Sequence, residues 1–294
     1  MSGASGLIGS ALVASLRDRG RRVVQLVRRD PRGPDELRWD PSAGTITAGA
    51  LDGAAAVINL SGAGINDHRW TDEYKRTLVE SRTRTTELLA TTIAAADQRP
   101  AVLLSGSAIG YYGDGGTEPL SEDAPPGDDF LADLCRQWEA ATAAAEAAGV
   151  RTVHLRTGIV LTDRGGALKK QLPLFKLGLG GRFGDGRQWQ SWISLADEVG
   201  AIIHLLDADV AGAVNLVAPH PVTNREFTSV LASVLRRPAV MPIPSFGPKL
   251  LLGSELAEAL LYTSQRVQPT RLEASGYHFE HPTLEVALRA ILGR

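Results

Sequence analysis

Short runs of apolar and β-branched residues alternate along the chain with longer segments in which apolar residues recur at helical spacing. The short runs predict buried strands, and the longer segments predict amphipathic helices. Such alternation is typical of an α/β fold built on a parallel sheet. The predicted strands are residues 22–27, 56–60, 101–105, 152–156 and 213–217. One predicted helix begins at Leu7, and the others cover residues 71–96, 130–148, 250–261 and 284–292.

A glycine-rich turn precedes the first predicted helix, with the sequence Gly3-Ala4-Ser5-Gly6-Leu7-Ile8-Gly9. In a Rossmann-type loop the first glycine permits a tight turn and the second lets backbone amides approach a pyrophosphate. The third lets the helix pack on the sheet, with its N-terminus facing the phosphates. Here the turn opens a helix and a strand follows one helix later, which is the context that the motif requires. The expected dinucleotide contacts are Gly3, Ser5, Gly6, Leu7, Ile8 and Gly9.

Only Met1 and Ser2 precede this loop, whereas a Rossmann loop follows a buried first strand. Either the sequence starts late or the sheet lacks its central strand. The first alternative is favoured, because a missing central strand would expose the faces of both neighbouring strands. We therefore expect a Rossmann-type doubly wound parallel sheet with a truncated first strand.

The end of the second predicted strand carries two arginines. NAD-binding proteins usually end this strand with an acidic residue that binds the ribose hydroxyls, but here Val27 is followed by Arg28 and Arg29. Guanidinium groups form bidentate, charge-assisted hydrogen bonds with phosphate, which suits a 2′-phosphate. The pattern favours NADP over NAD. The alternative is that both arginines are solvated surface residues in a turn.

Composition limits the remaining classes. The formal net charge is −2 and no block of basic residues occurs, which argues against a nucleic-acid partner. No apolar stretch approaches the roughly 20 residues of a membrane span, and no signal-peptide pattern opens the chain, so we expect a cytoplasmic protein. The single cysteine excludes an intrachain disulfide, and no ligand spacing predicts a metal site.

Two later segments differ from the alternating pattern. Residues 165–186 are glycine-rich and residues 238–248 are proline-rich, which predicts loops. We interpret the later part of the chain as a smaller lobe inserted around the last strands. The predicted division gives a cofactor-binding domain of residues 1–161 plus 196–218, and a C-terminal α+β substrate lobe of residues 162–195 plus 219–294.

Together with the glycine loop, Asn59-Leu60-Ser61-Gly62 and residues 105–114 resemble an extended short-chain dehydrogenase/reductase. More narrowly, the chain resembles the atypical "epimerase family" group, which is nucleotide-sugar epimerase-like and has a small C-terminal domain. The resemblance covers essentially the whole chain. Further markers, in chain order, are Arg69-Trp70-Thr71, Ser81-Arg82, Trp138-Glu139, Arg156-Thr157-Gly158, Gly180-Gly181, Gly184-x-Gly186-Arg187-Gln188, Trp192-Ile193, Gln265-Arg266-Val267-Gln268-Pro269 and Gly276-Tyr277-x-Phe279.

The resemblance implies hydride transfer at a nicotinamide, with a Ser and a Tyr-x-x-x-Lys motif handling the proton. In that scheme the Tyr is the acid/base, the Lys lowers its pKa and the Ser orients the substrate oxygen. The resemblance also implies a homodimer through the helices at residues 71–96 and 130–148. It adds the following to the expected cofactor contacts: Leu60, Ser61, Gly62, Arg82 and Ser105.

The catalytic pattern of these relatives is incomplete here. Ser107 matches the Ser, but counting back from Glu139 puts Leu131 at the Tyr position and Cys135 at the Lys position. Leu131 has no proton to give, and Cys135 has no fixed positive charge. The helix Asn that often supports the relay is also replaced, by the Ser81-Arg82 pair. This break fits the atypical group and weakens the case for catalysis.

Three residues are candidates to replace the missing acid. Tyr111 and Tyr112 follow Ser107 at the carboxyl edge of a strand, where such folds place ligands. The alternative is that both rings pack the loop. Cys135 would serve as an acid or thiolate if a cation such as Arg82 lowered its pKa, or it is a small buried apolar side chain.

The substrate lobe offers a further set of polar residues. Arg156 ends a strand, so we expect it to point towards the cleft. The glycine-flanked loop carries Arg187, Gln188 and Trp189. Arg187 suits a phosphate or carboxylate, and Trp189 suits a sugar or planar face. The alternative is a loop packed on its own lobe.

Two functions of different classes follow. The first is an NADP(H)-dependent oxidoreductase or epimerase that acts on an unknown small molecule, sugar-like or nucleotide-linked, through a non-standard proton relay. The second is a catalytically inactive NADPH-binding sensor or regulatory protein. The missing Tyr and Lys favour the second, whereas Ser107, Arg156 and Arg187 favour the first.

Overall fold

The structure is a computed structural model that describes residues 1–239, 242–244 and 246–294. Its centre is a parallel sheet of β4 (Ala56–Asn59), β5 (Val102–Ala108), β7 (Arg151–Thr157) and β11 (Gly212–Leu216). The spatial order is β11-β7-β5-β4. Each contains apolar or β-branched residues that are buried in the sheet, as in buried parallel strands. The predicted α/β fold with a parallel sheet is confirmed.

Beyond β4 the sheet continues through the first two residues of the chain. Ser2 N donates to Ile58 O at 2.9 Å, and Leu26 N donates to Met1 O at 2.8 Å. Residues 1–2 thus lie between β4 and β1 (Gln25–Val27) and join the two strands. Parallel β2 (Glu36–Asp40) and antiparallel β3 (Thr45–Ile46) complete this side. The place of the central strand is therefore filled, by a two-residue bridge.

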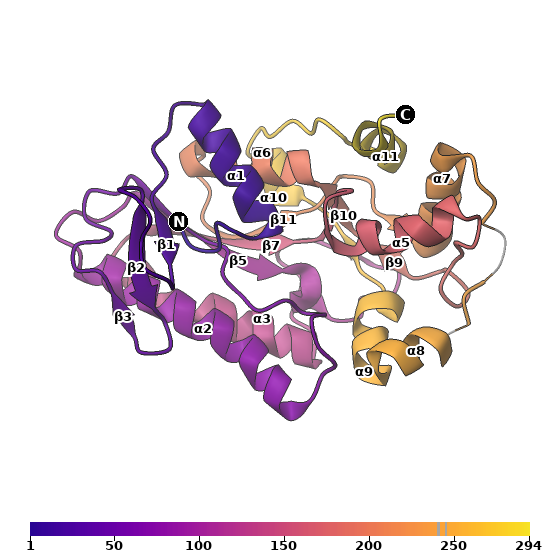
Figure 1. Ribbon diagram of the computed structural model, residues 1–294, viewed down its shortest axis with the longest axis horizontal. Helices are drawn as coiled ribbons and strands as arrows, with labels where there is room; N and C mark the ends of the chain where they lie inside the picture. Colours follow the sequence, from indigo (N-terminus) through magenta and orange to yellow (C-terminus); the bar gives the residue numbers. More distant parts are fainter. Residues whose placement is uncertain (240–241, 245) are drawn as a thin grey trace.

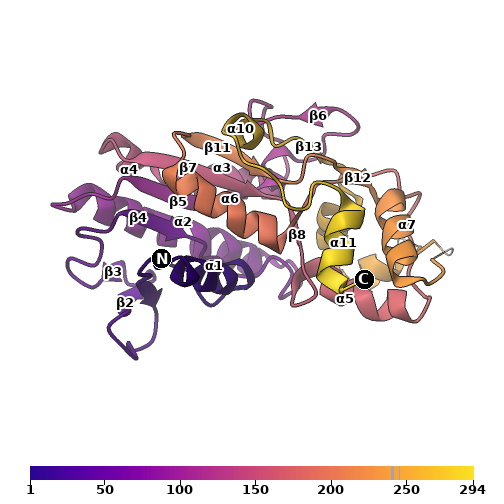
Figure 2. The same cartoon turned by 90° about the horizontal axis from the view of Figure 1, so that it is seen from above.

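Helices cover both faces of the sheet (Figures 1 and 2). On one face α1 (Leu7–Asp18) packs beside α6 (Leu195–Asp207). On the other face lie α2 (Asp72–Ala95), α3 (Phe130–Ala140) and α4 (Ala143–Ala147). Each face buries its own apolar cluster against the strands. Helices on both faces of a parallel sheet are the arrangement of a doubly wound fold.

The long helix predicted at residues 130–148 is interrupted. It ends as α3 at Ala140 and resumes as α4 at Ala143. At the break, Thr142 Oγ1 donates to Glu139 O at 2.7 Å. A threonine hydroxyl that bonds the preceding turn competes with helical hydrogen bonding, which the alanine-rich pattern does not reveal.

The glycine-rich segment was wrongly predicted as a loop over its first half, because α5 (Gly166–Lys176) lies there. Leu168, Leu172 and Phe175 are buried at helical spacing. They form one apolar cluster with α7 (Asn224–Leu235) and α11 (Leu284–Leu292). The glycine content obscured this stripe, although the stripe is what binds α5 to the other helices.

Helix α7 was not predicted, although its start carries a signal. Thr223 and Glu226 form a reciprocal capping box at its N-terminus, and this pattern is visible in sequence. The helix predicted at residues 250–261 forms in three pieces: α8 (Phe246–Leu252), α9 (Ser254–Ala257) and the π-helical turn η2 (Glu258–Tyr262). Gly253, with φ +90°, separates α8 from α9. The terminal helix was predicted at its observed bounds, as α11.

Short strand pairs connect the later segments to the sheet edge. These are β8 (Ile159–Leu161) with β10 (Trp192–Ser194), β9 (Trp189–Gln190) with β12 (Val222–Thr223), and β6 (Pro119–Leu120) with β13 (Arg266–Val267). A short helix, α10 (Thr270–Ala274), follows β13. Of the proline-rich segment 238–248, residues 240–241 and 245 lie outside the described residues. The predicted domain division stays a prediction.

Asp197 ties the end of the chain to α6. Its fully buried carboxylate accepts hydrogen bonds from Tyr277 Oη at 3.1 Å and from the backbone amides of Glu280 and His281 at 2.7 and 2.9 Å. The N-cap of α6 is Ser194, whose hydroxyl accepts from Asp197 N. Asp197 itself therefore acts as a tertiary clamp.

Candidate cofactor and active site

The glycine loop fits tightly against the end of β4. Gly3 has φ +69°, and a Cβ there would lie 2.4 Å from Leu60 O. A Cβ on Gly9 would lie 2.1 Å from Gly3 O. No real side chain makes such contacts, so both positions require glycine. The loop thus brings its backbone directly onto the Leu60-Ser61 turn.

The first turn of α1 leaves its amides open. Gly6 is the N-cap and no side chain caps the helix. The N–H groups of the first turn, at Leu7, Ile8 and Gly9, have no partner within an α-helix. Together with the helix dipole they form an anion site of the kind that binds a pyrophosphate. The geometry of this loop fits the phosphates of a dinucleotide.

The turn after β4 is held by buried Asn59. Its side-chain oxygen accepts from Ser2 Oγ at 2.6 Å and from Ser61 N at 3.2 Å, and its amide donates to Thr86 at 2.8 Å. These bonds fix the path of residues 60–62. The turn therefore presents the expected cofactor contacts Leu60, Ser61 and Gly62 beside the glycine loop.

Two of the expected cofactor contacts have buried polar atoms without partners among the described residues. These atoms are Arg82 Nε and Ser105 Oγ. Arg82 donates to the carbonyls of Leu78 and Ala63, and its guanidinium lies 5.1 Å from the ring centroid of Trp138. Burial lowers the pKa of Arg82. Unpaired buried polar groups are disfavoured unless a ligand or water satisfies them, so both atoms fit a bound group at this edge.

The two arginines after β1 differ in their surroundings. Arg29 makes a bidentate ion pair with Glu36, with distances of 2.7 and 2.6 Å. Arg28 is exposed at the end of the strand. The hydrogen bonds from Arg29 and from Arg32 N lower the pKa of Glu36 to about 2. A 2′-phosphate at Arg29 would therefore compete with this carboxylate.

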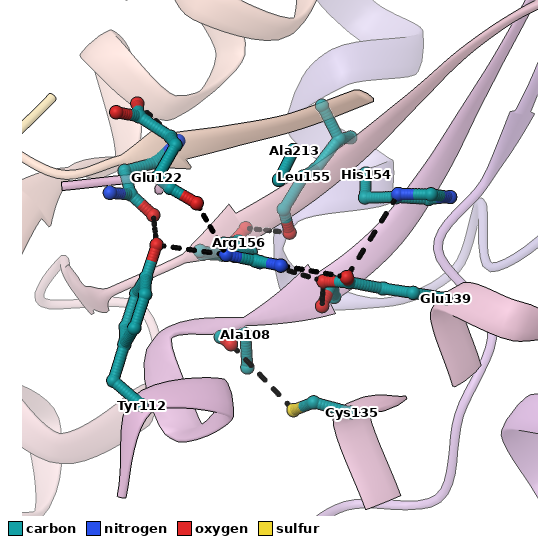
Figure 3. A network of polar contacts seen from close by, with 12 residues as sticks. Ala108, Tyr112, Glu122, Cys135, Glu139, His154, Leu155, Arg156 and Ala213 are labelled. Atoms are coloured by element: carbon teal, nitrogen blue, oxygen red, sulfur yellow. Dashed lines mark hydrogen bonds and ion pairs between the residues drawn. The ribbon is translucent and has the colours of Figure 1, made fainter. Parts of the chain in front are cut away.

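Glu139 and Arg156 lie at the centre of a polar network (Figure 3). Ser107, at the carboxyl end of β5, joins this network through Glu139. Arg156 Nε and Nη2 donate to the two oxygens of Glu139 at 2.8 and 2.9 Å. Ser107 Oγ donates to Glu139 Oε1 at 2.6 Å. Burial alone would raise the pKa of Glu139, but the hydrogen bonds and charge of Arg156 outweigh it and lower the pKa. The carboxylate is therefore ionised at neutral pH.

An ionised carboxylate accepts hydrogen bonds and donates none. The Ser107 hydroxyl has one proton, and that proton points to Glu139. Towards a ligand Ser107 therefore offers lone pairs. A substrate hydroxyl or N–H suits this site, whereas a carbonyl oxygen finds no donor at Ser107.

Tyr111 and Tyr112 are both in contact with Arg156. Tyr112 is buried; its hydroxyl donates to Asn215 at 2.7 Å and accepts from Arg156 at 3.0 Å. Burial, the largest influence, raises its pKa. The Arg156 guanidinium carbon lies 3.4 Å from the ring centroid of Tyr111. Both rings thus support Arg156, which favours the packing alternative for Tyr112.

Leu131 and Cys135 lie where the resemblance would place Tyr and Lys. Leu131 packs against Gly110: a Cβ added to Gly110 would lie 3.2 Å from the Cβ of Leu131. Cys135 is buried, and its Sγ lies 3.6 Å from Ala108 O. Burial, assisted by the charge of Glu139, raises the pKa of the thiol to about 12. Arg82 does not reverse this, so the structure favours the small buried side chain over a thiolate.

The expected substrate residues are dispersed. Arg156 points into the network with Glu139, and its charge is already paired. Gln188 donates to Leu261 O at 2.8 Å, and the ring of Trp189 is stacked by Arg266 at 4.6 Å. Arg187 is exposed, and with Gln188 it lines a cleft of about 280 Å³.

Sequence reasoning missed the central role of Glu139. It treated this residue only as a marker beside Trp138, because its partners lie on other elements. His154, on β7, lies with its Nδ1 4.0 Å from Oε2 of Glu139. Of the described residues, no group of three or more His, Cys, Asp or Glu side chains is arranged to hold a metal ion. Nor does any helix in the described ranges have the length and apolarity to cross a membrane.

The chain is similar in sequence to known protein families and proteins. Residues 1–217 match the model of the NAD dependent epimerase/dehydratase family, and residues 243–291 match a domain of unknown function, DUF1731. The chain is 43% identical to the epimerase family protein Mb2239 of Mycobacterium bovis over 289 residues, covering 98% of this chain and 95% of that protein.

Two solved structures are also similar. Human epimerase family protein SDR39U1, crystallised with NADPH, is 36% identical with a TM-score of 0.92, covering 99% of this chain and 98% of that one. A nucleoside-diphosphate sugar epimerase from Corynebacterium glutamicum is 38% identical with a TM-score of 0.80, covering 99% of this chain and 57% of that one. The epimerase model spans most of the chain, including the glycine loop, Ser107 and Arg156. The chain therefore belongs to the NAD dependent epimerase/dehydratase family.

Proposed function

We propose that this protein is an NADP(H)-dependent oxidoreductase or epimerase in which Ser107, held by Glu139 and Arg156, positions the reacting hydroxyl of a small-molecule substrate. The observation that carries the proposal is the Ser107–Glu139–Arg156 network at the carboxyl end of β5. Open α/β sheets bind their ligands at this edge. A fully paired, buried ion pair that orients one hydroxyl is a feature of a preorganised site.

The glycine loop and the open first turn of α1 would hold the pyrophosphate. Arg28 and Arg29 would hold the 2′-phosphate, and the NADPH bound to human SDR39U1 supports this choice of cofactor. When bound, the cofactor supplies a hydride or accepts one. Arg82 and Ser105 would offer their unpartnered atoms to its nicotinamide half.

Three residues of this chain, Ser107, Glu139 and Arg156, bind and orient the substrate without transferring a proton to it. Ser107 accepts a hydrogen bond from the substrate hydroxyl and donates its own hydrogen bond to Glu139. Arg156 keeps Glu139 ionised. Tyr111 is the protic side chain beside this network whose ring, rather than its hydroxyl, contacts Arg156. Its hydroxyl is the proposed proton donor or acceptor for the substrate.

The substrate class follows from the exposed loop. Arg187 lines a cleft with Thr117, Asp185 and Ser264, and its charge suits a phosphate or carboxylate. A sugar or nucleotide-sugar is therefore the proposed substrate at this cleft. A homodimer through α2 with α3–α4 and a cytoplasmic location remain predictions from the sequence.

The experiment is a two-part measurement on the full chain. NADPH and NADH binding are measured by cofactor fluorescence, and sugars, nucleotide-sugars and simple secondary alcohols are screened with NADP⁺ for NADPH formation. We expect tighter binding of NADPH than NADH, and turnover of an alcohol that Ser107→Ala abolishes while NADPH binding persists. Equal binding of the two cofactors would overturn the cofactor assignment.

The second candidate function is an NADPH-binding sensor without catalysis. Leu131 and Cys135, which stand in place of the usual Tyr and Lys, favour it. Tight NADPH binding with no oxidation of any alcohol in the screen, and no effect of Tyr111→Phe or Ser107→Ala on any measured property except stability, would favour the sensor over the enzyme.

A further inference from the structure

A second cleft shares η2 with the cleft that Arg187 lines: Tyr262 lines the first, and Glu258 and Ala259 line the second. Its volume is about 480 Å³, which is in the range of small-molecule sites. Four apolar side chains form its walls: Trp70, Phe130, Leu131 and Ala259. The walls come from the loop before α2, the start of α3, and η2.

This cleft borders the candidate active site through Leu131 and Phe130. Leu131 packs on Gly110, which belongs to the turn after β5. Phe130 lies in the same apolar cluster as Ala108 and Tyr111. The two aromatic rings in the wall, Trp70 and Phe130, meet edge to face with centroids 5.0 Å apart. Leu131 stands where related enzymes place a hydroxyl, so the wall is apolar at the point where the resemblance implies an acid.

The charges around the cleft have one predominant sign. Asp129, Glu255 and Glu258 line it, and no arginine does so among the described residues. Glu255 is paired with Lys75, and Glu258 with Lys249 at 2.8 Å. Each lysine is thus paired with a lining carboxylate, and Lys75 Nζ also lies 5.1 Å from the Phe130 ring centroid. Asp129 accepts a hydrogen bond from Ala132 N at the start of α3 and is the lining carboxylate without an ion-pair partner among the described residues. A diphosphate would meet repulsion here, whereas a neutral or cationic body would not.

We propose that this cleft is a binding site for a neutral or cationic ligand with an aromatic or alicyclic body, and that nucleoside diphosphates are excluded from it. The argument for this ligand class is the combination of apolar walls, two aromatic rings and a net negative rim. The proposed site is separate from the sugar or nucleotide-sugar site proposed at the cleft that Arg187 lines. The proposal concerns binding and is independent of catalysis.

The test uses two probes with one body. N-phenyl-1-naphthylamine is neutral, and 1-anilinonaphthalene-8-sulfonate carries the same rings with one sulfonate. Fluorescence titration of the full chain should give saturable binding of the neutral probe and about tenfold weaker binding of the sulfonate. UDP-glucose should displace neither. Equal or tighter binding of the sulfonate, displacement by UDP-glucose, or no binding of the neutral probe would each overturn the proposal.

Matched variants locate the probe. Leu131→Asn should weaken binding of the neutral probe by about tenfold, because it removes a large apolar wall contact. Leu177→Asn makes the same change at an exposed leucine outside the cleft and should change the affinity by less than about twofold. Ala259→Phe fills the cleft from another element and should also weaken binding. If neither Leu131→Asn nor Ala259→Phe exceeds the effect of Leu177→Asn, the probe binds elsewhere and the proposal fails.

The charge of the rim is tested separately. Glu258→Gln removes one lining carboxylate and should strengthen sulfonate binding by about threefold, with little change for the neutral probe. An unchanged ratio of the two affinities would contradict the electrostatic part of the proposal. NADPH binding is measured on the same samples. If the unaltered protein binds NADPH but not the neutral probe, the cleft proposal alone is refuted. If it binds the probe but not NADPH, the cofactor site alone is refuted.

Discussion

Ser107 and Glu139 are joined by a hydrogen bond of 2.6 Å that commits the only hydroxyl proton of the serine to a carboxylate. The bond crosses from β5 to α3, and Arg156 on β7 keeps its acceptor ionised. Three elements thus determine the direction in which one hydroxyl points. The resemblance implies a serine that orients the substrate oxygen beside a tyrosine acid/base; here the serine is itself oriented by an ion pair.

Removing the negative charge of Glu139 should destabilise the fold. In Glu139→Gln, Arg156 keeps its charge at a site that is almost fully buried and loses its ion-pair partner. Breaking a buried pair in this way costs about 3–5 kcal/mol, and the retained amide hydrogen bonds should reduce this to about 2 kcal/mol. Urea denaturation measures the change. Glu146→Gln, at a half-exposed carboxylate near His154, is the control and should change stability by less than about 1 kcal/mol. Equal effects of the two variants would contradict the central role of Glu139.

Stability should depend on pH through Glu198. This carboxyl is fully buried, and burial raises its pKa from 4.5 to about 8, although Thr157 donates a hydrogen bond to it. Between these two values the folded protein holds a proton that the unfolded chain has released, so the free energy of unfolding falls as the pH rises. Above about pH 8 this loss is complete.

Glu198→Gln removes this titration while keeping an acceptor for Thr157. The stability of the variant relative to the original protein should therefore increase as the pH is raised from about 5 to about 8. Denaturant unfolding at several pH values measures the difference. Glu87→Gln, on the exposed side of α2, should leave the pH dependence unchanged. A difference that is constant with pH would show that Glu198 does not titrate in this way.

The cofactor loop should not tolerate a methyl group at Gly9. The added Cβ would lie 2.1 Å from Gly3 O, so the loop must shift away from the first turn of α1. We expect Gly9→Ala to weaken NADPH binding by more than about tenfold, because the pyrophosphate depends on the path of this backbone. Gly33→Ala is the control, since a Cβ there meets nothing within 4 Å. Retention of full NADPH affinity in Gly9→Ala would place the phosphates elsewhere.

Cofactor preference should respond to Glu36. This carboxylate pairs with Arg29 through two hydrogen bonds. Glu36→Gln releases the guanidinium for a 2′-phosphate and should increase the preference for NADPH over NADH, whereas Arg29→Ser should reduce it. Fluorescence titration with both cofactors gives the ratio. If both variants leave the ratio unchanged, Arg29 is a surface residue without a role in selection.

Cys135 should be unreactive in the folded protein. Its burial and its pKa of about 12 leave almost no thiolate at neutral pH, and thiolate is the reactive form. A disulfide-exchange reagent should modify it at about the rate of unfolding, and in denaturant it should react at once. Cys135→Ala should keep NADPH affinity. Rapid labelling of the native protein would reopen the thiolate alternative.

Local patterns predicted those parts of the fold whose stabilisation is local or periodic. The apolar runs at β4, β5, β7 and β11 and the stripe of α11 are visible as patterns in the chain. The glycine loop was predictable because its motif encodes steric requirements at Gly3 and Gly9. Helix α5 was missed because flanking glycines outweighed a three-residue apolar stripe. Helix α5 was thus missed where two local signals compete, whereas α7 was missed although its capping box is visible in the sequence.

The candidate site was less predictable because its bonds join distant elements. Arg156 was expected to face a substrate, yet its partner Glu139 lies on the helix that precedes its own strand. The spacing between the two residues carries no motif that would announce an ion pair. Cys135 could be interpreted as a thiolate or as a buried apolar residue until its burial was known. Pairing and burial are tertiary properties, and sequence spacing alone did not determine them.

Asp197 has a consequence for how the two matched regions can be exchanged or inherited. The epimerase match ends at residue 217 and the DUF1731 match begins at residue 243, yet the amides of Glu280 and His281 satisfy a buried carboxylate on α6. Without the second region that side chain would lose the donors of Tyr277, Glu280 and His281 and would keep the Ser194 hydroxyl at 2.9 Å. The C-terminal region is therefore not a detachable cassette. A chimera that joins the first region to a foreign C-terminal domain must also supply donors for Asp197.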